Sequence, residues 1–153
     1  MSFWEHDWAW SLPLIVGTIV VHVVVLGYVT RKGTVILARW DERGESIILF
    51  CVLLGIIALL ATILLAFEAV AWGLAYLSIG ALPDSTSAIL FSLNAITAFG
   101  HTDLNLAPRW QLMGALEALN GIILFGLTIS FLFVTIQSAF LRREPRKSHR
   151  RDA

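Results

Sequence analysis

The sequence predicts an all-α membrane protein with three transmembrane helices and one short re-entrant helix, which enters the membrane and returns to the same side. Three observations lead to this fold class. The chain of 153 residues is 58% hydrophobic and only 14% charged, whereas an ordinary soluble domain is about 25% charged. Three apolar stretches are long enough to cross a bilayer, and a fourth, between the second and the third, is too short. This composition excludes a disordered chain, a secreted disulfide scaffold and a soluble enzyme.

Each span is predicted from a long apolar run. The first transmembrane helix is predicted over 11–30, where His22 is the only interruption. An outer helix is predicted over 46–82, and its first 22 residues carry no charge. An inner helix is predicted over 109–141. Because the backbone groups of a lone span have no other partners in lipid, each span is expected to be helical.

The basic residues predict the orientation. Four of them lie in a loop at 31–45 and six in the tail at 142–153, whereas 1–10 and 80–108 have none. Positively charged segments stay in the cytoplasm, so we expect an external N-terminus, a cytoplasmic loop and a cytoplasmic tail. The tail also suits contact with anionic lipids. Eleven basic residues balance eleven acidic ones, so the net charge gives no argument for a nucleic-acid partner.

The segment between the second and third spans predicts the re-entrant element. Pro83 is expected to break the preceding helix, and Asp84, with the serines that follow it, offers N-cap chemistry for a new one. A pore helix is therefore predicted over 84–98. Gly100 ends it, a polar loop follows, and Pro108 comes just before the third span.

Such an element predicts a pore. Non-helical backbone at membrane depth is tolerated only where it is buried in protein or lines a water-filled path. One chain of this kind cannot close a path, so we expect a ring of identical chains around a central axis. The C-terminal end of each short helix would point at that axis, and its partial negative charge favours cations.

Three stretches resemble a known family. Residues 97–103 (TAFGHTD) resemble the filter T-x-G-Y-G-D of potassium channels and related pore-loop cation channels. Residues 115–126 (ALEALNGIILFG) resemble the inner helix of small bacterial channels of this type. Residues 67–84 resemble the outer-helix end and turret of short bacterial ion-channel homologues with an extra N-terminal span. The resemblance makes 46–141 a pore domain.

The resemblance implies a function. It implies a homotetramer in the bacterial inner membrane that passes potassium or another monovalent cation passively, with no cofactor and no other metal. Carbonyl oxygens of a filter-like loop at 98–103 would replace the ion's hydration shell. No GxSxG, HExxH or paired catalytic carboxylates occur in the chain, so we expect no enzymatic activity.

The filter-like loop also departs from the family pattern. Only Gly100 and Asp103 match strictly. Ala98 lacks the hydroxyl of the usual threonine, His101 replaces an aromatic residue, and Thr102 replaces a glycine that supplies a positive φ. These departures leave an alternative open, in which the chain is a poorly selective or non-conducting channel-fold subunit with a structural or regulatory role.

The candidate site residues form three groups. The filter-like loop comprises Thr97, Ala98, Phe99, Gly100, His101, Thr102 and Asp103, the pore-support candidates are Glu68, Asn94 and Glu117, and the hinge candidates are Gly121 and Gly126. Each group has two interpretations. His101 is a pH sensor at the outer mouth or fills an aromatic's space, and Asp103 bonds the back of the pore helix or is a solvated loop acid. The two glycines bend the inner helix or allow close packing.

The charged residues within the spans need partners, because an unpaired charge at the bilayer centre costs about 2.5–3.5 kcal/mol on insertion scales. Glu68 and Glu117 are expected either at the membrane interface or behind the pore loop, supporting it through Asn94 or Thr97. His22 has no second metal-ligating residue three or four positions away. We therefore expect it to be a helix-interface residue rather than a metal ligand.

Overall fold

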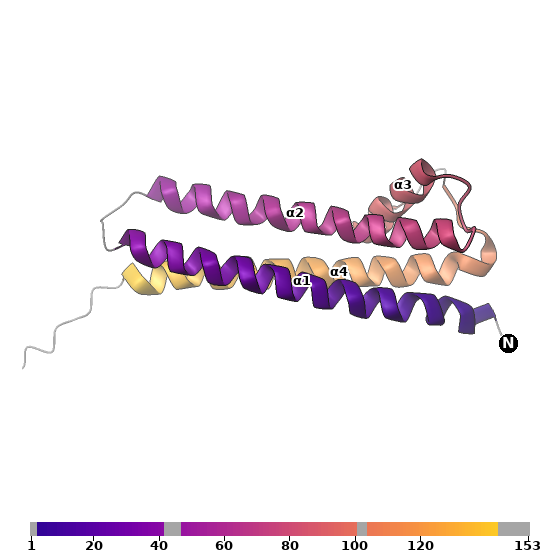
Figure 1. Ribbon diagram of the computed structural model, residues 1–153, viewed down its shortest axis with the longest axis horizontal. Helices are drawn as coiled ribbons and strands as arrows, with labels where there is room; N and C mark the ends of the chain where they lie inside the picture. Colours follow the sequence, from indigo (N-terminus) through magenta and orange to yellow (C-terminus); the bar gives the residue numbers. More distant parts are fainter. Residues whose placement is uncertain (1–2, 42–46, 101–103, 144–153) are drawn as a thin grey trace, which may run out of the picture.

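The computed structural model describes residues 3–41, 47–100 and 104–143. This part of the chain is helical, without a strand. Its elements are α1 (Phe3–Asp41), α2 (Ile47–Ser78), α3 (Ser85–Ile96), the short 3₁₀ helix η1 (Pro108–Trp110) and α4 (Gln111–Arg143). Figure 1 shows α1, α2 and α4 as three long helices side by side, with α3 at one end of the bundle. We call this the Asp84 end, and the opposite end, where α1 finishes, the Asp41 end.

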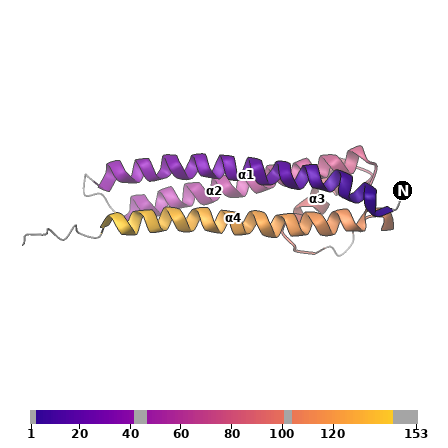
Figure 2. The same ribbon diagram turned by 90° about the horizontal axis from the view of Figure 1, so that it is seen from below.

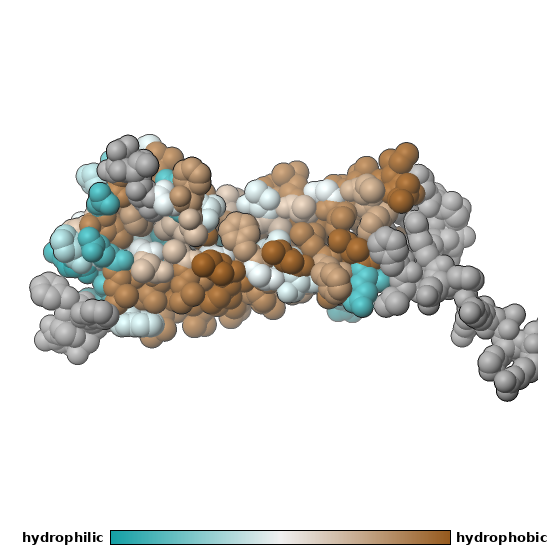
Figure 3. All heavy atoms as spheres, turned by 180° about the vertical axis from the view of Figure 1, so that it is seen from behind, coloured by the Kyte–Doolittle hydropathy of each residue, from teal (hydrophilic) through white to brown (hydrophobic). Residues whose placement is uncertain are grey.

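The three long helices are apolar enough to cross a membrane. Such stretches cover His6–Ile36, Phe50–Ser78 and Pro108–Ser138. Many large apolar side chains on these helices are exposed, among them Val24, Leu59 and Ile129. Brown, hydrophobic residues accordingly dominate the middle of the face in Figure 3, while teal residues gather towards its ends. An apolar surface of this extent is the surface of a protein that lies in lipid. The prediction of an all-helical fold with three helices long and apolar enough to span a membrane is confirmed for the described residues.

The helices extend beyond or fall short of the predicted ranges. The first helix was predicted over 11–30 but runs over Phe3–Asp41, so most of the predicted basic loop at 31–45 is helical. A helix does not stop where its apolar run stops, because long charged side chains are good helix formers and reach water beyond the lipid. The last helix likewise continues to Arg143, past the predicted 109–141.

The end of α2 has a different cause from the predicted one. The helix stops at Ser78 rather than at 82, before Pro83 acts. Gly80 has a φ of 66°, and the backbone N–H of Ala81 donates to the Tyr76 carbonyl oxygen at 2.9 Å, while that of Gly80 donates to Leu77 at 3.1 Å. This pair of bonds is a Schellman motif, in which glycine takes the left-handed position.

The start of α3 is as predicted. Asp84 is its N-cap, and the Asp84 carboxylate accepts from the Ser87 N–H at 2.9 Å. The two hydrogen bonds from Ser87, through its N–H and its hydroxyl, lower the pKa of the Asp84 carboxyl below its ordinary value. The helix ends at Ile96, two residues before the predicted 98. Its end is again a Schellman motif, since Ala98 N–H donates to Ala95 and Phe99 N–H to Asn94.

The path of α3 is antiparallel to α2. Ala88 lies against Gly73, Ser92 bonds the carbonyl of Ala69, and Ile96 packs in one cluster with Leu65. The twelve residues of α3 thus descend along α2 by roughly 18 Å at 1.5 Å a residue, from the Asp84 end towards the middle of the bundle.

The chain then returns to the Asp84 end. Leu106 contacts Gly114 in the first turns of α4, and η1 leads into that helix. In Figure 2, viewed at right angles to Figure 1, α3 again lies at the Asp84 end. The first buried cluster fills this end, where Trp72 and Tyr76 of α2, Phe91 of α3 and Met113 of α4 pack together.

Candidate functional site

The contact between α3 and α4 is made without space for a side chain at Gly121. A Cβ atom added there would overlap the Ile96 carbonyl oxygen and would lie 2.6 Å from the carbonyl carbon. Both atoms are backbone and cannot turn away. At the other end of α3, a Cβ on Gly73 would lie 3.3 Å from the Ala88 carbonyl oxygen. Glycines on α2 and α4 therefore form the seat into which α3 fits.

Glu117 is the polar centre of this seat. Its side chain is fully buried and accepts a hydrogen bond of 2.7 Å from the Tyr76 hydroxyl on α2. Its other carboxylate oxygen contacts the hydroxyl of Ser92 on α3. Ser92 also lies 2.6 Å from the carbonyl oxygen of Ala69. One carboxylate thus links α2, α3 and α4.

This arrangement bears on the two interpretations of Glu117. The side chain is buried among helices of its own chain. It contacts α3, as the supporting role requires, but through Ser92 rather than through the predicted Asn94 or Thr97. Those two side chains bond carbonyls of their own helix, Asn94 to Leu90 at 2.9 Å and Thr97 to Leu93 at 2.7 Å.

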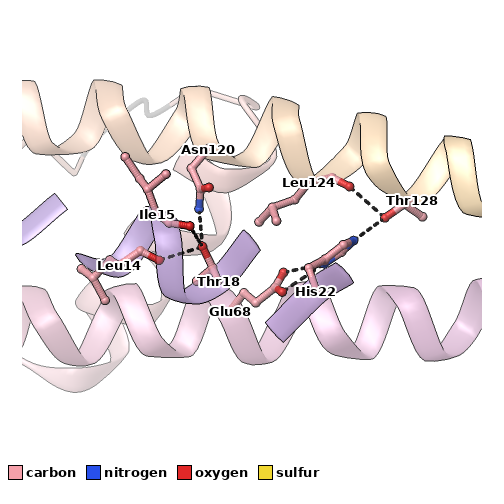
Figure 4. Close-up of polar contacts among 8 residues, drawn as sticks. All are labelled: Leu14, Ile15, Thr18, His22, Glu68, Asn120, Leu124 and Thr128. Carbon is pink, nitrogen blue, oxygen red and sulfur yellow. Dashed lines mark hydrogen bonds and ion pairs between the residues drawn. The ribbon is translucent and has the colours of Figure 1, made fainter. Parts of the chain in front are cut away.

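Glu68 has a different partner, and neither predicted role describes it. Its carboxylate is 4% exposed and lies 3.0 and 3.1 Å from the Nδ1 atom of His22 on α1. The Nε2 atom of His22 lies 2.9 Å from the hydroxyl oxygen of Thr128 on α4. Figure 4 shows the His22 ring between these two partners. The prediction that His22 is a helix-interface residue is confirmed, and Glu68 supports α1 rather than α3.

A second polar contact joins α1 to α4. The Asn120 side-chain amide donates to the Thr18 hydroxyl oxygen at 2.9 Å, one turn of α1 away from His22. The Thr18 hydroxyl in turn lies 2.8 Å from the Leu14 carbonyl oxygen (Figure 4). Both side chains are buried. The interface of α1 with its neighbours therefore includes polar contacts beside the buried apolar cluster of Leu26, Ala61 and Leu64.

In the described part of the filter-like loop, no other segment of the chain covers the residues. Thr97, Ala98, Phe99 and Gly100 are exposed, Phe99 by 84%. Ala98 has a φ of 52° and Gly100 a φ of 88°. A hollow of about 370 Å³ between α3, α4 and the returning chain lies beside these residues, with Asn94 in its lining. His101, Thr102 and Asp103 lie outside the described residues.

The two hinge candidates differ in their surroundings. The helix α4 runs without a break through Gly121 and Gly126. Gly121 serves the close approach of α3. Gly126 has no atom within 4 Å of an added Cβ, so packing within the chain does not explain it, and its role as a hinge stays a prediction.

The prediction from sequence did not include the polar face of α1. The residues Asp7, Ser11, Thr18 and His22 are all buried, and their spacings of 4, 7 and 4 place them on one face of a helix. This periodicity was available in the sequence and predicts a face that packs against protein. The partners Tyr76, Ser92 and Asn120 gave no local signal, because each contact joins residues far apart in the chain.

The described residues contain no group of three His, Cys, Asp or Glu side chains that could hold a metal ion. No protein-family model, curated protein or solved structure matches the chain.

Proposed function

We propose that the chain forms a homotetrameric membrane pore that passes monovalent cations, potassium among them, passively along an axis between four copies. The observation that carries the proposal is the path of α3, which descends along α2 to the middle of the bundle and ends in exposed, non-helical backbone. The resemblance to potassium channels supports the number of copies and the permeant ion.

The exposed end of α3 supports an assembly. Ile96, which directly precedes Thr97 to Gly100, lies at the level of Leu65 and Gly121, well inside the apolar length of α2 and α4. Non-helical backbone at that depth is not stable against lipid. It needs a neighbouring chain, a water-filled path, or both. Several copies around an axis supply both at once.

The electrostatics of the same end support cations. The carbonyl groups at the C-terminal end of a helix carry partial negative charge, and the residues that directly follow α3, Thr97 to Gly100, are exposed. Between residues 80 and 108 the sequence has no Lys or Arg. A cation that approaches this end meets no opposing fixed charge from that segment.

The seat of α3 supports a rigid pore element. Glu117 links α3 to both neighbouring helices, and Gly121 sets the closest approach of α3 to α4. A selectivity element must keep its carbonyl oxygens in place while ions pass, and a helix fitted against two others meets this need. The proposal includes an external N-terminus, a cytoplasmic basic tail near anionic lipids and a bacterial inner membrane.

Currents through planar bilayers test the proposal. Purified chain should carry cation current, and Gly100→Asp, which places a carboxylate in the loop, should abolish it. Gly55→Ala is the matched control, because an added Cβ at Gly55 in α2 has no atom within 4 Å, and it should conduct as the native chain does.

A second arm addresses the departures in the loop. The triple variant Ala98→Thr, His101→Tyr and Thr102→Gly restores the family filter and should become selective for potassium over sodium. Chemical crosslinking in membranes should stop at a tetramer. A chain that crosslinks to a tetramer but conducts in neither form would be the structural or regulatory subunit instead. A chain that stays monomeric would remove the pore proposal altogether.

A further inference from the structure

The buried pair of His22 and Glu68 lies outside the proposed pore axis and has no role in it. Its ring and carboxylate are 0% and 4% exposed. The pair borders buried apolar residues on both sides, Leu26 of α1 on the Asp41 side and Leu124 of α4 on the Asp84 side. An ionisable pair in such surroundings is a functional candidate by default, because charge is costly within a membrane.

The hydrogen-bond partners of the His22 ring indicate which of its nitrogens carry hydrogens. The Thr128 hydroxyl has one hydrogen, and its oxygen is 3.0 Å from the Leu124 carbonyl oxygen, which can only accept. The Thr128 oxygen is therefore the acceptor for His22 Nε2, at 2.9 Å. This contact places a hydrogen on Nε2.

The second ring nitrogen faces the carboxylate. Nδ1 of His22 is 3.0 Å from Oε1 and 3.1 Å from Oε2 of Glu68. A nearly equal approach to both oxygens is the geometry of an N–H shared by an ionised carboxylate, whereas a protonated carboxyl would direct a single O–H at the nitrogen. Nδ1 therefore carries a hydrogen as well.

We infer that the His22–Glu68 pair is a proton-binding site, occupied by one proton as an imidazolium–carboxylate pair of zero net charge. When the proton leaves, Nδ1 loses its hydrogen and a neutral ring faces an ionised carboxylate. The pair then has a net charge of −1 in apolar surroundings, and its ring no longer donates to Glu68. The proton thus holds α1 against α2. The site is independent of the proposed conduction.

A hollow beside the pair extends along α1 and α2 towards the Asp84 side of the bundle. It has a volume of about 280 Å³, lies between α1 and α2, and includes Thr18 and Glu68 in its lining. All of its residues on α1, from Pro13 to Val21, precede His22. Gly17 leaves it open, since a Cβ there would have no atom within 4 Å.

Buried polar atoms continue from the pair in the same direction. Asp7 Oδ1, Ser11 Oγ and Asn120 Oδ1 are buried and have no hydrogen-bond partner among the described residues. Polar atoms of this kind in protein interiors are satisfied by water. On the other side, Leu26, Ala61 and Leu64 form a buried apolar cluster. We therefore assign the access of protons to the Asp84 end.

The other titratable groups of the packed helices lie farther from the pair. Glu117 of α4 bonds Tyr76 and Ser92, Tyr76 lies two turns from Glu68 along α2, and Asp7 lies four turns from His22 along α1. The helix α3 has no titratable side chain. Among the described residues, none within one turn of His22, Glu68 or Thr128 titrates, apart from the pair itself.

Nitrogen NMR of the full chain in lipid nanodiscs tests this site directly. With ¹⁵N-labelled histidine, the His22 signal is identified by its loss in His22→Gln. At pH 7.5 a histidine with ordinary solution behaviour is about one-tenth protonated. The native His22 ring should instead carry hydrogen on both nitrogens in nearly all molecules. A His22 ring with hydrogen on one nitrogen at that pH would overturn the assignment.

Two variants sharpen the test. Glu68→Gln keeps the size of the side chain but removes its charge, so the doubly protonated form of His22 at pH 7.5 should fall to a small minority of molecules, because a buried charged ring then has no ionised partner. An unchanged fraction would contradict the pair. Thr62→Val is the matched control, because the Thr62 hydroxyl is exposed and bonds only its own helix at Ala58. It should leave the His22 signal as in the native chain.

The access route has its own variant. Gly17→Leu fills the hollow and should slow the exchange of the His22 ring hydrogens with water several-fold, without changing the protonated fraction. An unchanged exchange rate would overturn the route from the Asp84 end. Crosslinking between cysteines introduced at Val21 and Leu64 should decrease as the pair loses its proton at high pH in the native chain, and should be independent of pH in Glu68→Gln.

Discussion

Two helices are fitted onto the α2–α4 pair in different ways. The helix α3 is held by shape, because glycines at 73 and 121 bring its backbone against two neighbours, and a single carboxylate, Glu117, ties the three together. The helix α1 is held by buried polar contacts in addition to the apolar cluster around Leu26. Its contacts include the pair of His22 with Glu68 and the bond from Asn120 to Thr18, and a hollow remains open beside them.

The difference indicates different tasks. A helix fitted by backbone contact has one position, which suits an element that must present its end accurately. A helix held by a few polar bonds beside a hollow can change its contacts when a proton or a side chain changes. Substitutions at the contacts of α3 and at those of α1 should therefore change the free energy of unfolding by different amounts. Their effects should also depend differently on pH.

The largest effect is expected at Gly121. In Gly121→Val the new side chain meets the Ile96 backbone, which cannot move without lifting α3 from α4. We expect a loss of about 3 kcal/mol or more in the free energy of unfolding, since overpacking against backbone is not relieved by a rotamer change. Thermal unfolding in detergent measures it. Gly126→Ala, with no neighbour within 4 Å, should be neutral or stabilising by up to about 1 kcal/mol. Equal losses of stability in both variants would contradict the close contact between Gly121 and the Ile96 backbone.

The second-largest loss of stability is expected at the contact of α1 with α2. Replacing either His22 or Glu68 by Ala leaves a buried polar partner unpaired, which costs about 3 kcal/mol in comparable cases. Because both changes remove the same contact, the double variant should lose about 2 kcal/mol less than the sum of the two. Unfolding of all four proteins in one detergent completes the cycle. Additive losses would show that the two side chains do not interact.

Glu117→Ala should weaken the α3 seat by about 2 kcal/mol, because the buried Tyr76 hydroxyl loses its acceptor. Ser92 keeps the Ala69 carbonyl oxygen as a partner, so the loss should be smaller than that of Gly121→Val. Glu117→Gln keeps an acceptor oxygen and should cost less than the alanine variant. The same unfolding assay ranks the three, and a cost for Gln above that for Ala would contradict the role given to the hydroxyl contacts.

The smallest effect is expected at Ala98, where α3 ends. Its φ of 52° is a left-handed conformation that costs a residue with a Cβ atom about 1 kcal/mol. Ala98→Gly should therefore stabilise the fold by about that amount. Ala95→Gly, inside the same helix, is the matched control and should destabilise it. If both variants lose stability, the left-handed end of α3 is not populated in the membrane.

The sequence predicted the elements better than their contacts. The three spans, the short helix and its cap at Asp84 follow from local patterns, namely apolar length and the residue types at a helix start. The end of α2 was assigned to Pro83, although the glycine three residues earlier was sufficient to end it.

The contact partners of the buried polar residues could not be predicted from local sequence patterns. Glu117 was expected near the short helix, but Ser92 was not among its expected contacts, because a serine within a helix has no distinctive pattern. Glu68 and His22 are 46 residues apart, and no local rule connects them. Only the spacing of polar residues on α1 could have indicated that this helix packs on its polar face.

The path of α3 is the central claim, and cysteine accessibility in intact membrane vesicles tests it most directly. In a Cys51→Ser background, single cysteines are introduced at Thr86 and Asn105, which are exposed before and after the dip, and at Lys32 near the Asp41 end. A membrane-impermeant thiol reagent should label Thr86→Cys and Asn105→Cys from the same side and Lys32→Cys from the other. Labelling of Thr86→Cys and Asn105→Cys from opposite sides would contradict the account.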